Sequence, residues 1–204
     1  MRLLILGATG GTGHALLSEG LDHGHDLTAF VRSPQKISLS HPRLKVLAGD
    51  PLDFRPLAAA LRGHDAVLAA FGPRTLRRTT TRQEFGQALV TALKHTGVRR
   101  VIAVSSALLF PPAGVLPFLL KHTVFRNALR DSGEMERQIH ANELDWTMVR
   151  PPRLTDGPKT GKIRLADGRL PGGRTKISRS DLASFMITEV EKNEYLRRVV
   201  GVCA

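Results

Sequence analysis

The chain of 204 residues has little cysteine, few aromatic residues and no long apolar run. Its single cysteine, Cys203, excludes an internal disulfide, so the fold does not depend on an oxidising compartment. Aromatic residues make up 5% of the sequence, which predicts an aliphatic, alanine-rich core. No stretch approaches the roughly 20 apolar residues of a membrane helix, and the apolar run at 3–6 is too short for a signal peptide. We therefore expect a cytoplasmic protein that does not enter a membrane.

Acidic residues are scarce relative to basic ones. The chain has 18 Asp and Glu residues and 30 Lys and Arg residues, which gives a formal net charge of +12. Such a balance suits either nucleic acid or an anionic cofactor. Basic residues are spread along the chain, and the one dense group, 74–82, has no interleaved aromatic residue. We therefore favour a small anionic ligand and keep nucleic acid as a third hypothesis, whose phosphate contacts would be Arg74, Arg77, Arg78 and Arg82.

Short apolar runs alternate with helical patterns along the chain. Strands are expected at 2–6, 26–31, 44–48, 65–70, 100–104, 146–149 and 197–202, and helices at 13–23, 53–61, 83–95, 131–142 and 180–190. This alternation predicts a parallel sheet with right-handed crossovers. Because no linker or repeat interrupts it, we expect one doubly wound α/β domain over 1–204, a Rossmann fold with a small C-terminal lobe from Pro151 onward.

A glycine-rich segment directly follows the first expected strand and opens the first expected helix. It has the pattern G-x-x-G-x-x-G, a variant of the dinucleotide-binding fingerprint. Its candidate cofactor-binding residues are Gly7, Thr9, Gly10, Gly11, Thr12 and Gly13. The three spaced glycines permit a sharp turn, close approach of a pyrophosphate and tight helix packing, and the helix N-terminus supplies free amides. The segment therefore predicts a dinucleotide site.

The second expected strand ends without the acidic residue that usually holds the ribose hydroxyls of NAD. Arg32 stands there instead, with Lys36 nearby, and both can pair with a 2′-phosphate. We therefore expect NADP(H) as the cofactor. Alternatively, Arg32 is a solvated surface residue without a binding role. Asp50, after the third strand, is a candidate partner of the adenine amino group or, alternatively, a turn or cap residue.

Two further strand ends are expected to face the cofactor. Gly72 follows the fourth strand and permits close approach, and Arg74 can reach a phosphate. Ser105 and Ser106 follow the fifth strand, at the carboxyl edge where such sheets bind ligands. Ser106 is the candidate catalytic residue, holding the nicotinamide amide or polarising a substrate carbonyl; alternatively, it caps a turn.

These motifs together resemble the atypical short-chain dehydrogenases/reductases, and within them the biliverdin reductase B and flavin reductase family. The resemblance covers nearly the whole chain, through the segments 7–13, 31–34, 49–50, 104–107, 144–152 and 178–186. It implies an NADPH-dependent reductase with an open substrate cleft. Beyond the glycine turn, it implies cofactor contacts at Arg32, Asp50, Gly72, Arg74, Ser105, Ser106, Pro151 and Pro152. The adjoining Pro51, Phe71 and Arg153 complete the expected set. Arg153 stands where the reductase pattern has histidine, and it would suit an anionic substrate.

The chemistry expected at this site is hydride transfer by positioning. The tyrosine-dependent mechanism of short-chain dehydrogenases is excluded, because the single tyrosine, Tyr195, has Val199 where that mechanism needs lysine. No metal-ligand spacing or nucleophile triad is present, so we expect no metal. The cofactor would carry the chemistry while the protein orients it. The uncharged stretch 108–120 is interpreted as an apolar wall or lid for a flat substrate, or as core packing.

We therefore expect an NADPH-dependent oxidoreductase that transfers hydride to a flat conjugated acceptor, such as a flavin, a quinone or a biliverdin-like tetrapyrrole. NmrA-like regulators share the early motifs. The alternative is thus a redox-sensing regulator that binds NADP(H) without turnover and acts through a protein partner. No long apolar helix suggests an obligate interface, so we expect a monomer.

Overall fold

A single sheet forms the centre of the computed structural model, which describes residues 1–71, 80–111, 125–172 and 175–204. Its strand order is β3-β2-β1-β4-β5-β6-β10-β8. The strands are β1 (Arg2–Leu6), β2 (Asp26–Val31), β3 (Leu44–Ala48), β4 (Ala66–Ala69), β5 (Arg100–Val104), β6 (Asp145–Arg150), β8 (Arg164–Asp167) and β10 (Arg198–Cys203). All pairings are parallel except that of β8 with β10 at the edge. The order reverses between β1 and β4.

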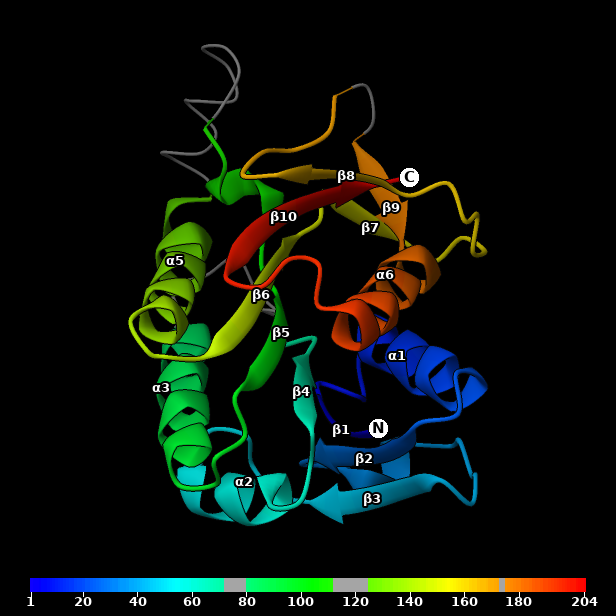
Figure 1. Cartoon of the computed structure of the whole chain (residues 1–204), viewed down its shortest axis with the longest axis vertical. Coiled ribbons are helices and arrows are strands. Elements are labelled where there is room, and N and C mark those ends of the chain that lie inside the picture. Colours follow the sequence, from blue (N-terminus) through cyan, green and yellow to red (C-terminus); the bar gives the residue numbers. More distant parts are fainter. Residues whose placement is uncertain (72–79, 112–124, 173–174) are drawn as a thin grey trace.

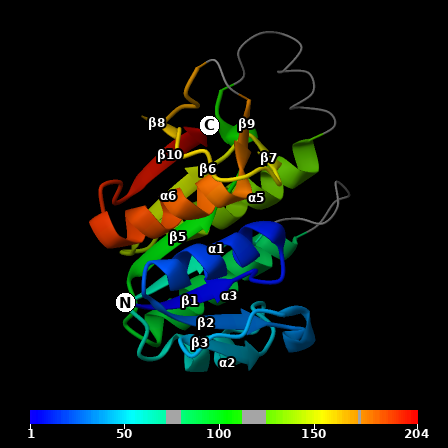
Figure 2. The ribbon, with the colours of Figure 1, turned by 90° about the vertical axis from the view of Figure 1, so that its right-hand side faces the viewer.

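Helices cover both faces of this sheet (Figures 1 and 2). One face carries α1 (Gly11–Asp22) and α6 (Arg179–Lys192), and the other carries α2 (Phe54–Leu61), α3 (Thr81–Lys94) and α5 (Arg126–His140). The central strands are buried on both faces, which explains their unbroken apolar runs. Leu17 and Met186 pack on one side, and Phe85 and Ile139 on the other. The predicted doubly wound α/β sheet is confirmed.

Helix α5 begins five residues before its expected start at Asp131. The buried carboxylate of Asp131 accepts hydrogen bonds from the backbone amides of Arg82 and Gln83, at 3.2 and 2.9 Å, and so caps α3. Asp131 therefore caps a different helix from the one to which it belongs.

The segment after Pro151 contains three short strands that the sequence did not reveal. Strand β8 extends the main sheet, whereas β7 (Arg153–Thr155) and β9 (Lys176–Ser178) form a separate two-stranded parallel sheet. Each strand is only three or four residues long and partly polar, so it carries little periodic signal. Short 3₁₀ turns occupy Pro34–Lys36 (η1) and Ala107–Leu109 (η2). Among the described helices, none has the length and apolar character needed to cross a membrane.

Candidate functional site

A cavity of about 710 Å³ lies at the carboxyl ends of β1, β2, β4 and β5. Ligands of open α/β sheets bind where the strand order reverses, and β1 and β4 flank that point here. The expected site residues that line it are Gly7, Thr9, Gly10, Gly11, Thr12, Arg32, Pro51, Phe71 and Ser105. The fold therefore brings the glycine turn, the end of β2 and the end of β5 to one cavity.

The glycine turn leaves its backbone open to this cavity. Gly7 has a φ of +81°, and a Cβ there would lie 2.6 Å from the carbonyl oxygen of Ala70. A Cβ at Gly13 would overlap the carbonyl oxygen of Gly7, so Gly13 serves packing and does not line the cavity. A Cβ at Gly10 would meet only that same oxygen, at 3.4 Å. The position where a pyrophosphate would lie is thus free of described protein atoms.

The N-terminus of α1 offers unused donors at the same place. Its N-cap, Gly10, has no side chain, and the first turn carries no acidic residue. The first amides of a helix have no intrahelical acceptor, and together with the helix dipole they favour an anion. These features fit the pyrophosphate of a dinucleotide.

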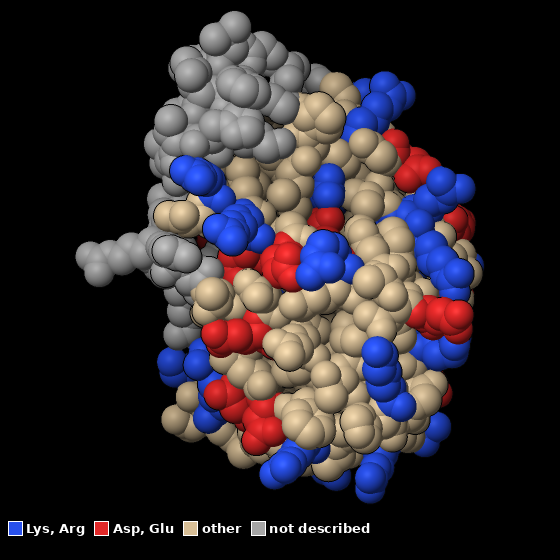
Figure 3. Space-filling model, turned by 90° about the vertical axis from the view of Figure 1, so that its left-hand side faces the viewer, with Lys and Arg blue, Asp and Glu red and all other residues tan. Residues whose placement is uncertain are grey.

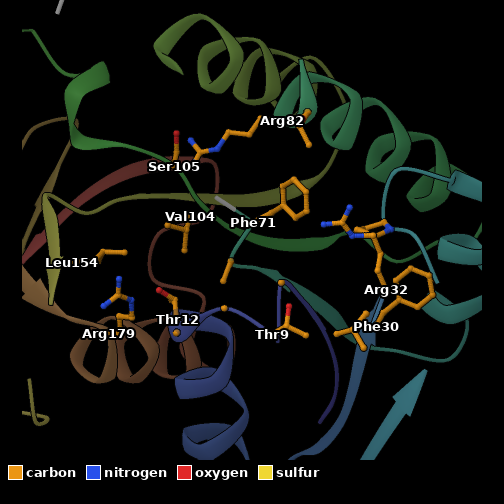
Figure 4. A pocket seen from close by; sticks show the side chains of 17 residues that line it. Thr9, Thr12, Phe30, Arg32, Phe71, Arg82, Val104, Ser105, Leu154 and Arg179 are labelled. Atoms are coloured by element: carbon orange, nitrogen blue, oxygen red, sulfur yellow. The ribbon is translucent and has the colours of Figure 1, made fainter. Parts of the chain in front are cut away.

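One end of the cavity is formed by Phe30 and Arg32 (Figure 4), and Pro51 also lines the cavity. Arg32 is exposed, and no ion pair to it is found among the described residues. Lys36 lies in η1 and Asp50 follows β3, but neither lines the cavity. The Asp50 carboxylate accepts the amide of Leu52 at 3.0 Å, which is the turn role held as the alternative. Its contact with adenine stays a prediction.

The opposite end is formed by Val104, Ser105, Leu154 and Arg82. Ser105 is 4% exposed, and its hydroxyl has no hydrogen-bond partner among the described residues. Ser106 does not line the cavity; its hydroxyl accepts the amide of Leu108 at 3.3 Å and caps η2. Ser105, expected as a cofactor contact, therefore lines the cavity, whereas Ser106, expected as the catalytic residue, does not.

Alternation along β5 explains this placement. Val101 and Ala103 pack toward α3 and α5, and Ile102 and Val104 pack toward α1 and α6. The amide of Ser105 still donates to Val149, at 2.8 Å, so the strand geometry extends to this residue. Ser105 thus belongs to the α3 side. The period of two could have favoured Ser105 over Ser106 from the sequence.

Two arginines that line the cavity were not expected to bind cofactor. Arg82 stands in the first turn of α3 and is 6% exposed; burial lowers the pKa of its guanidinium to about 10. Arg179 is the first residue of α6, and its side chain lies against the glycine turn. A Cβ on Gly11 would lie 2.7 Å from the Cδ of Arg179. Figure 4 places it beside Thr12, and it pairs with the exposed Asp156. Only the folded chain brings these distant segments together.

The remaining expected residues either do not line the cavity or fall outside the described residues. Gly72 and Arg74 fall outside the described residues, as does most of the expected apolar wall, from residue 112 to 120. Pro151, Pro152 and Arg153 do not line the cavity. The carbonyl of Pro151 accepts the amide of Ala107 at 3.1 Å and so fixes the start of η2. Arg153 is exposed in β7.

The charges around the site suit a small anion. Among the described lining residues, the only titratable side chains are Arg32, Arg82 and Arg179. The face over α3 and α5 shows basic side chains interspersed with acidic ones (Figure 3). Of the four arginines expected to contact phosphates in the nucleic-acid hypothesis, Arg74, Arg77 and Arg78 lie outside the described residues, and Arg82 is 6% exposed.

Comparison with known proteins agrees with this geometry. A family described as NAD(P)H-binding matches residues 7–193. The uncharacterized protein YwnB of Bacillus subtilis is 27% identical over 206 residues, covering 96% of this chain and 94% of YwnB. The 3-diazoavenalumate denitrifying reductase of a Streptomyces species is 26% identical over 200 residues, covering 84% of this chain and 64% of the reductase.

A solved structure from Streptococcus pneumoniae TIGR4, described as a candidate NADH-flavin reductase, is similar over almost the whole chain. Its TM-score is 0.79 at 25% identity, covering 99% of this chain and 98% of that one. The family match includes the glycine turn, the ends of β2 and β5, and the whole of α6. The chain therefore belongs to the NAD(P)H-binding family of Rossmann proteins, within the atypical short-chain dehydrogenases/reductases.

Proposed function

We propose that this protein is an NADPH-dependent reductase that transfers hydride to a flat conjugated acceptor, such as a flavin, a quinone or a tetrapyrrole. The observation that carries the proposal is a continuous cavity that runs from Arg32, across the glycine turn, to Ser105. A volume of about 710 Å³ lies within the range of roughly 300–1,000 Å³ typical of small-molecule sites. It has one end for the adenosine half of a dinucleotide and another for the nicotinamide and the acceptor.

Three groups of residues would hold the cofactor. The amides of Gly11 and Thr12, in the first turn of α1, would receive the pyrophosphate, with the guanidinium of Arg179 close to Gly11. Arg32 would pair with the 2′-phosphate at the far end. The cofactor supplies the hydride donor when bound.

The protein's own part in the reaction would be orientation and exclusion of water. Val104, Leu154 and Phe71 give the nicotinamide end apolar walls. The free hydroxyl of Ser105 would donate a hydrogen bond to the nicotinamide carboxamide or to a carbonyl of the acceptor. No carboxylic acid, histidine, tyrosine or cysteine lines the described part of the cavity. The proton that completes the reduction would therefore come from water.

The named relatives support a reductase. The Streptomyces relative is named as a reductase, and the Streptococcus structure is described as a candidate flavin reductase. Both descriptions fit a conjugated acceptor whose reduction needs no strong general acid. The flavin, quinone or tetrapyrrole identity of the acceptor is part of the proposal.

We expect Arg32→Glu to weaken NADPH binding by about 100-fold and NADH binding by less than threefold. The substitution removes charge-assisted hydrogen bonds to the 2′-phosphate and adds a repelling carboxylate, a loss of about 3 kcal/mol. Both dissociation constants are measured by titrating the fluorescence of the reduced nicotinamide. Arg62→Glu is the matched control, because Arg62 is exposed and does not line this cavity. Equal losses for the two cofactors would contradict the assignment of Arg32.

A redox-sensing regulator without turnover is the second candidate. The observation that favours it is the lack of any acid or base, other than arginine, among the described lining residues. In that case the cavity would bind NADP(H), and the signal would pass to a partner protein.

Turnover decides between the two candidates. The protein is mixed with NADPH and, in turn, FMN, riboflavin, biliverdin and a benzoquinone, and the nicotinamide absorbance is followed. We expect steady oxidation with at least one acceptor, at a rate that falls at least tenfold in Ser105→Ala. Tight NADPH binding with no oxidation by any acceptor would favour the regulator instead.

A further inference from the structure

Arg82 is a buried cation without a counter-ion of its own. It is 6% exposed, and its Nη1 donates to the hydroxyl of Ser132. Its Nε has no hydrogen-bond partner, and no ion pair to Arg82 is found in the described parts of the chain. Burial lowers its pKa to about 10, so the guanidinium remains charged at neutral pH.

The nearest carboxylates are already engaged. Asp131 accepts the backbone amides of Arg82 and Gln83. Glu136 receives two hydrogen bonds from Arg150, with Nε at 3.0 Å from Oε1 and Nη2 at 2.6 Å from Oε2. Both acids raise the pKa of Arg82 through space, but neither outweighs its burial. A buried charge that lacks a partner is costly, and such groups are concentrated at functional sites.

A second orphan group lies at the same end of the cavity. The hydroxyl of Ser105 is buried and without a partner among the described residues. In Figure 4 the guanidinium of Arg82 points toward Ser105, and both line the cavity. A guanidinium N–H and a hydroxyl, both free, form a ready pair of donors for one oxyanion.

The rest of the cavity indicates which anion this pair receives. The pyrophosphate has the helix amides and Arg179, and a 2′-phosphate has Arg32 at the other end, beyond Phe71 in Figure 4. The nicotinamide end of a dinucleotide carries an uncharged amide. Arg82 is therefore left for the molecule that accepts the hydride.

We propose that Arg82 and Ser105 form an anion-binding subsite that selects acceptors carrying a carboxylate beside the conjugated system. This inference rests on the proposed function and narrows its substrate class. The hydride and its two electrons would come from NADPH, which leaves as NADP⁺, and the proton from water. The carboxylate itself stays chemically unchanged and serves to align the acceptor.

The test uses benzoate and benzamide as a matched pair of flat probes. Each is titrated by NMR into the protein saturated with NADP⁺, at physiological salt, and the titrations are repeated without NADP⁺. We expect benzoate to bind at least tenfold more tightly than benzamide. Arg82→Gln should abolish this preference while changing the affinity for NADP⁺ by less than threefold. Arg62→Gln, an exposed charge removed elsewhere, should keep the preference.

Several results would overturn the subsite. Equal binding of benzoate and benzamide to the unmodified protein would overturn it. A tenfold loss of NADP⁺ affinity in Arg82→Gln would also overturn it, because that loss would assign the guanidinium to the cofactor. If Arg82→Gln does not fold, Arg82→Lys and Ser105→Ala replace it, and each should reduce the preference for benzoate. A protein that fails to bind NADP⁺ but prefers benzoate would refute the proposed function and retain the anion subsite.

Discussion

Gly10→Val is expected to lower the affinity for both NADPH and NADH by more than 100-fold. A Cβ at Gly10 would meet only the carbonyl oxygen of Gly7, at 3.4 Å, and otherwise faces the cavity. The valine methyl groups would occupy the space in which a pyrophosphate approaches the amides of α1. The backbone φ of −93° is acceptable to any residue, so the fold should persist. Titration of nicotinamide fluorescence measures the loss.

The matched control is Gly133→Ala in α5. A Cβ there would contact only Leu109, at an ordinary 3.7 Å, and the residue lies outside the cavity. We expect its cofactor affinity to equal that of the unmodified protein. If Gly10→Val binds both cofactors normally, with an unchanged melting temperature, the glycine turn is not the binding site.

Glu189→Ala should lower the free energy of unfolding by about 3–5 kcal/mol, as breaking one half of a buried ion pair does. Glu189 is 2% exposed and its Oε1 lies 2.7 Å from Nη2 of Arg100, itself 8% exposed. The same carboxylate oxygen accepts the hydroxyl of Thr147 at 3.1 Å and the amide of Tyr195 at 3.0 Å. Its loss leaves the buried guanidinium without its carboxylate and removes the acceptor of the amides of Glu194 and Tyr195, whereas the hydroxyl of Thr147 keeps the carbonyl of Tyr195 as an acceptor. Urea denaturation measures the change.

Glu194→Ala provides the comparison, because Glu194 is exposed and its carboxylate lies 3.8 Å from Lys192. Pairs of this kind contribute between about 0 and 1 kcal/mol. A Glu189→Ala protein within about 1 kcal/mol of the unmodified one would show that water or rearrangement compensates for Arg100. The network lies at the start of β5, whereas the cavity lies at its end. Cofactor affinity should therefore survive in the molecules that remain folded.

The sequence predicted the elements whose signals are local. Alternating apolar runs located the main strands, and the glycine pattern located the turn at Gly7–Gly13 together with its helix. The position of Arg32 at the end of β2 was predictable for the same reason, because Arg32 follows the strand directly in the sequence. Each prediction needed only neighbouring residues and the rule that parallel strands end at one edge.

Features that depend on distant segments were not predictable in the same way. Arg82 and Arg179 reach the cavity from the first turns of two helices far along the chain. Asp131 caps a helix that begins fifty residues earlier in the sequence. Ser106 was favoured over Ser105 as the catalytic residue because strand alternation was not carried past the end of β5, whereas in the structure Ser105 is the serine that lines the cavity. Sequence patterns indicate which kind of interaction a side chain can make, whereas the tertiary packing determines which residue is its partner.

The most direct test of the account is a crystal structure of the NADP⁺ complex. We predict the pyrophosphate on the amides that follow Gly10, the 2′-phosphate on Arg32, and the nicotinamide between Ser105 and Leu154, with the Arg82 guanidinium free to meet an acceptor. A dinucleotide lying in the reverse direction, or bound away from the glycine turn, would contradict the account.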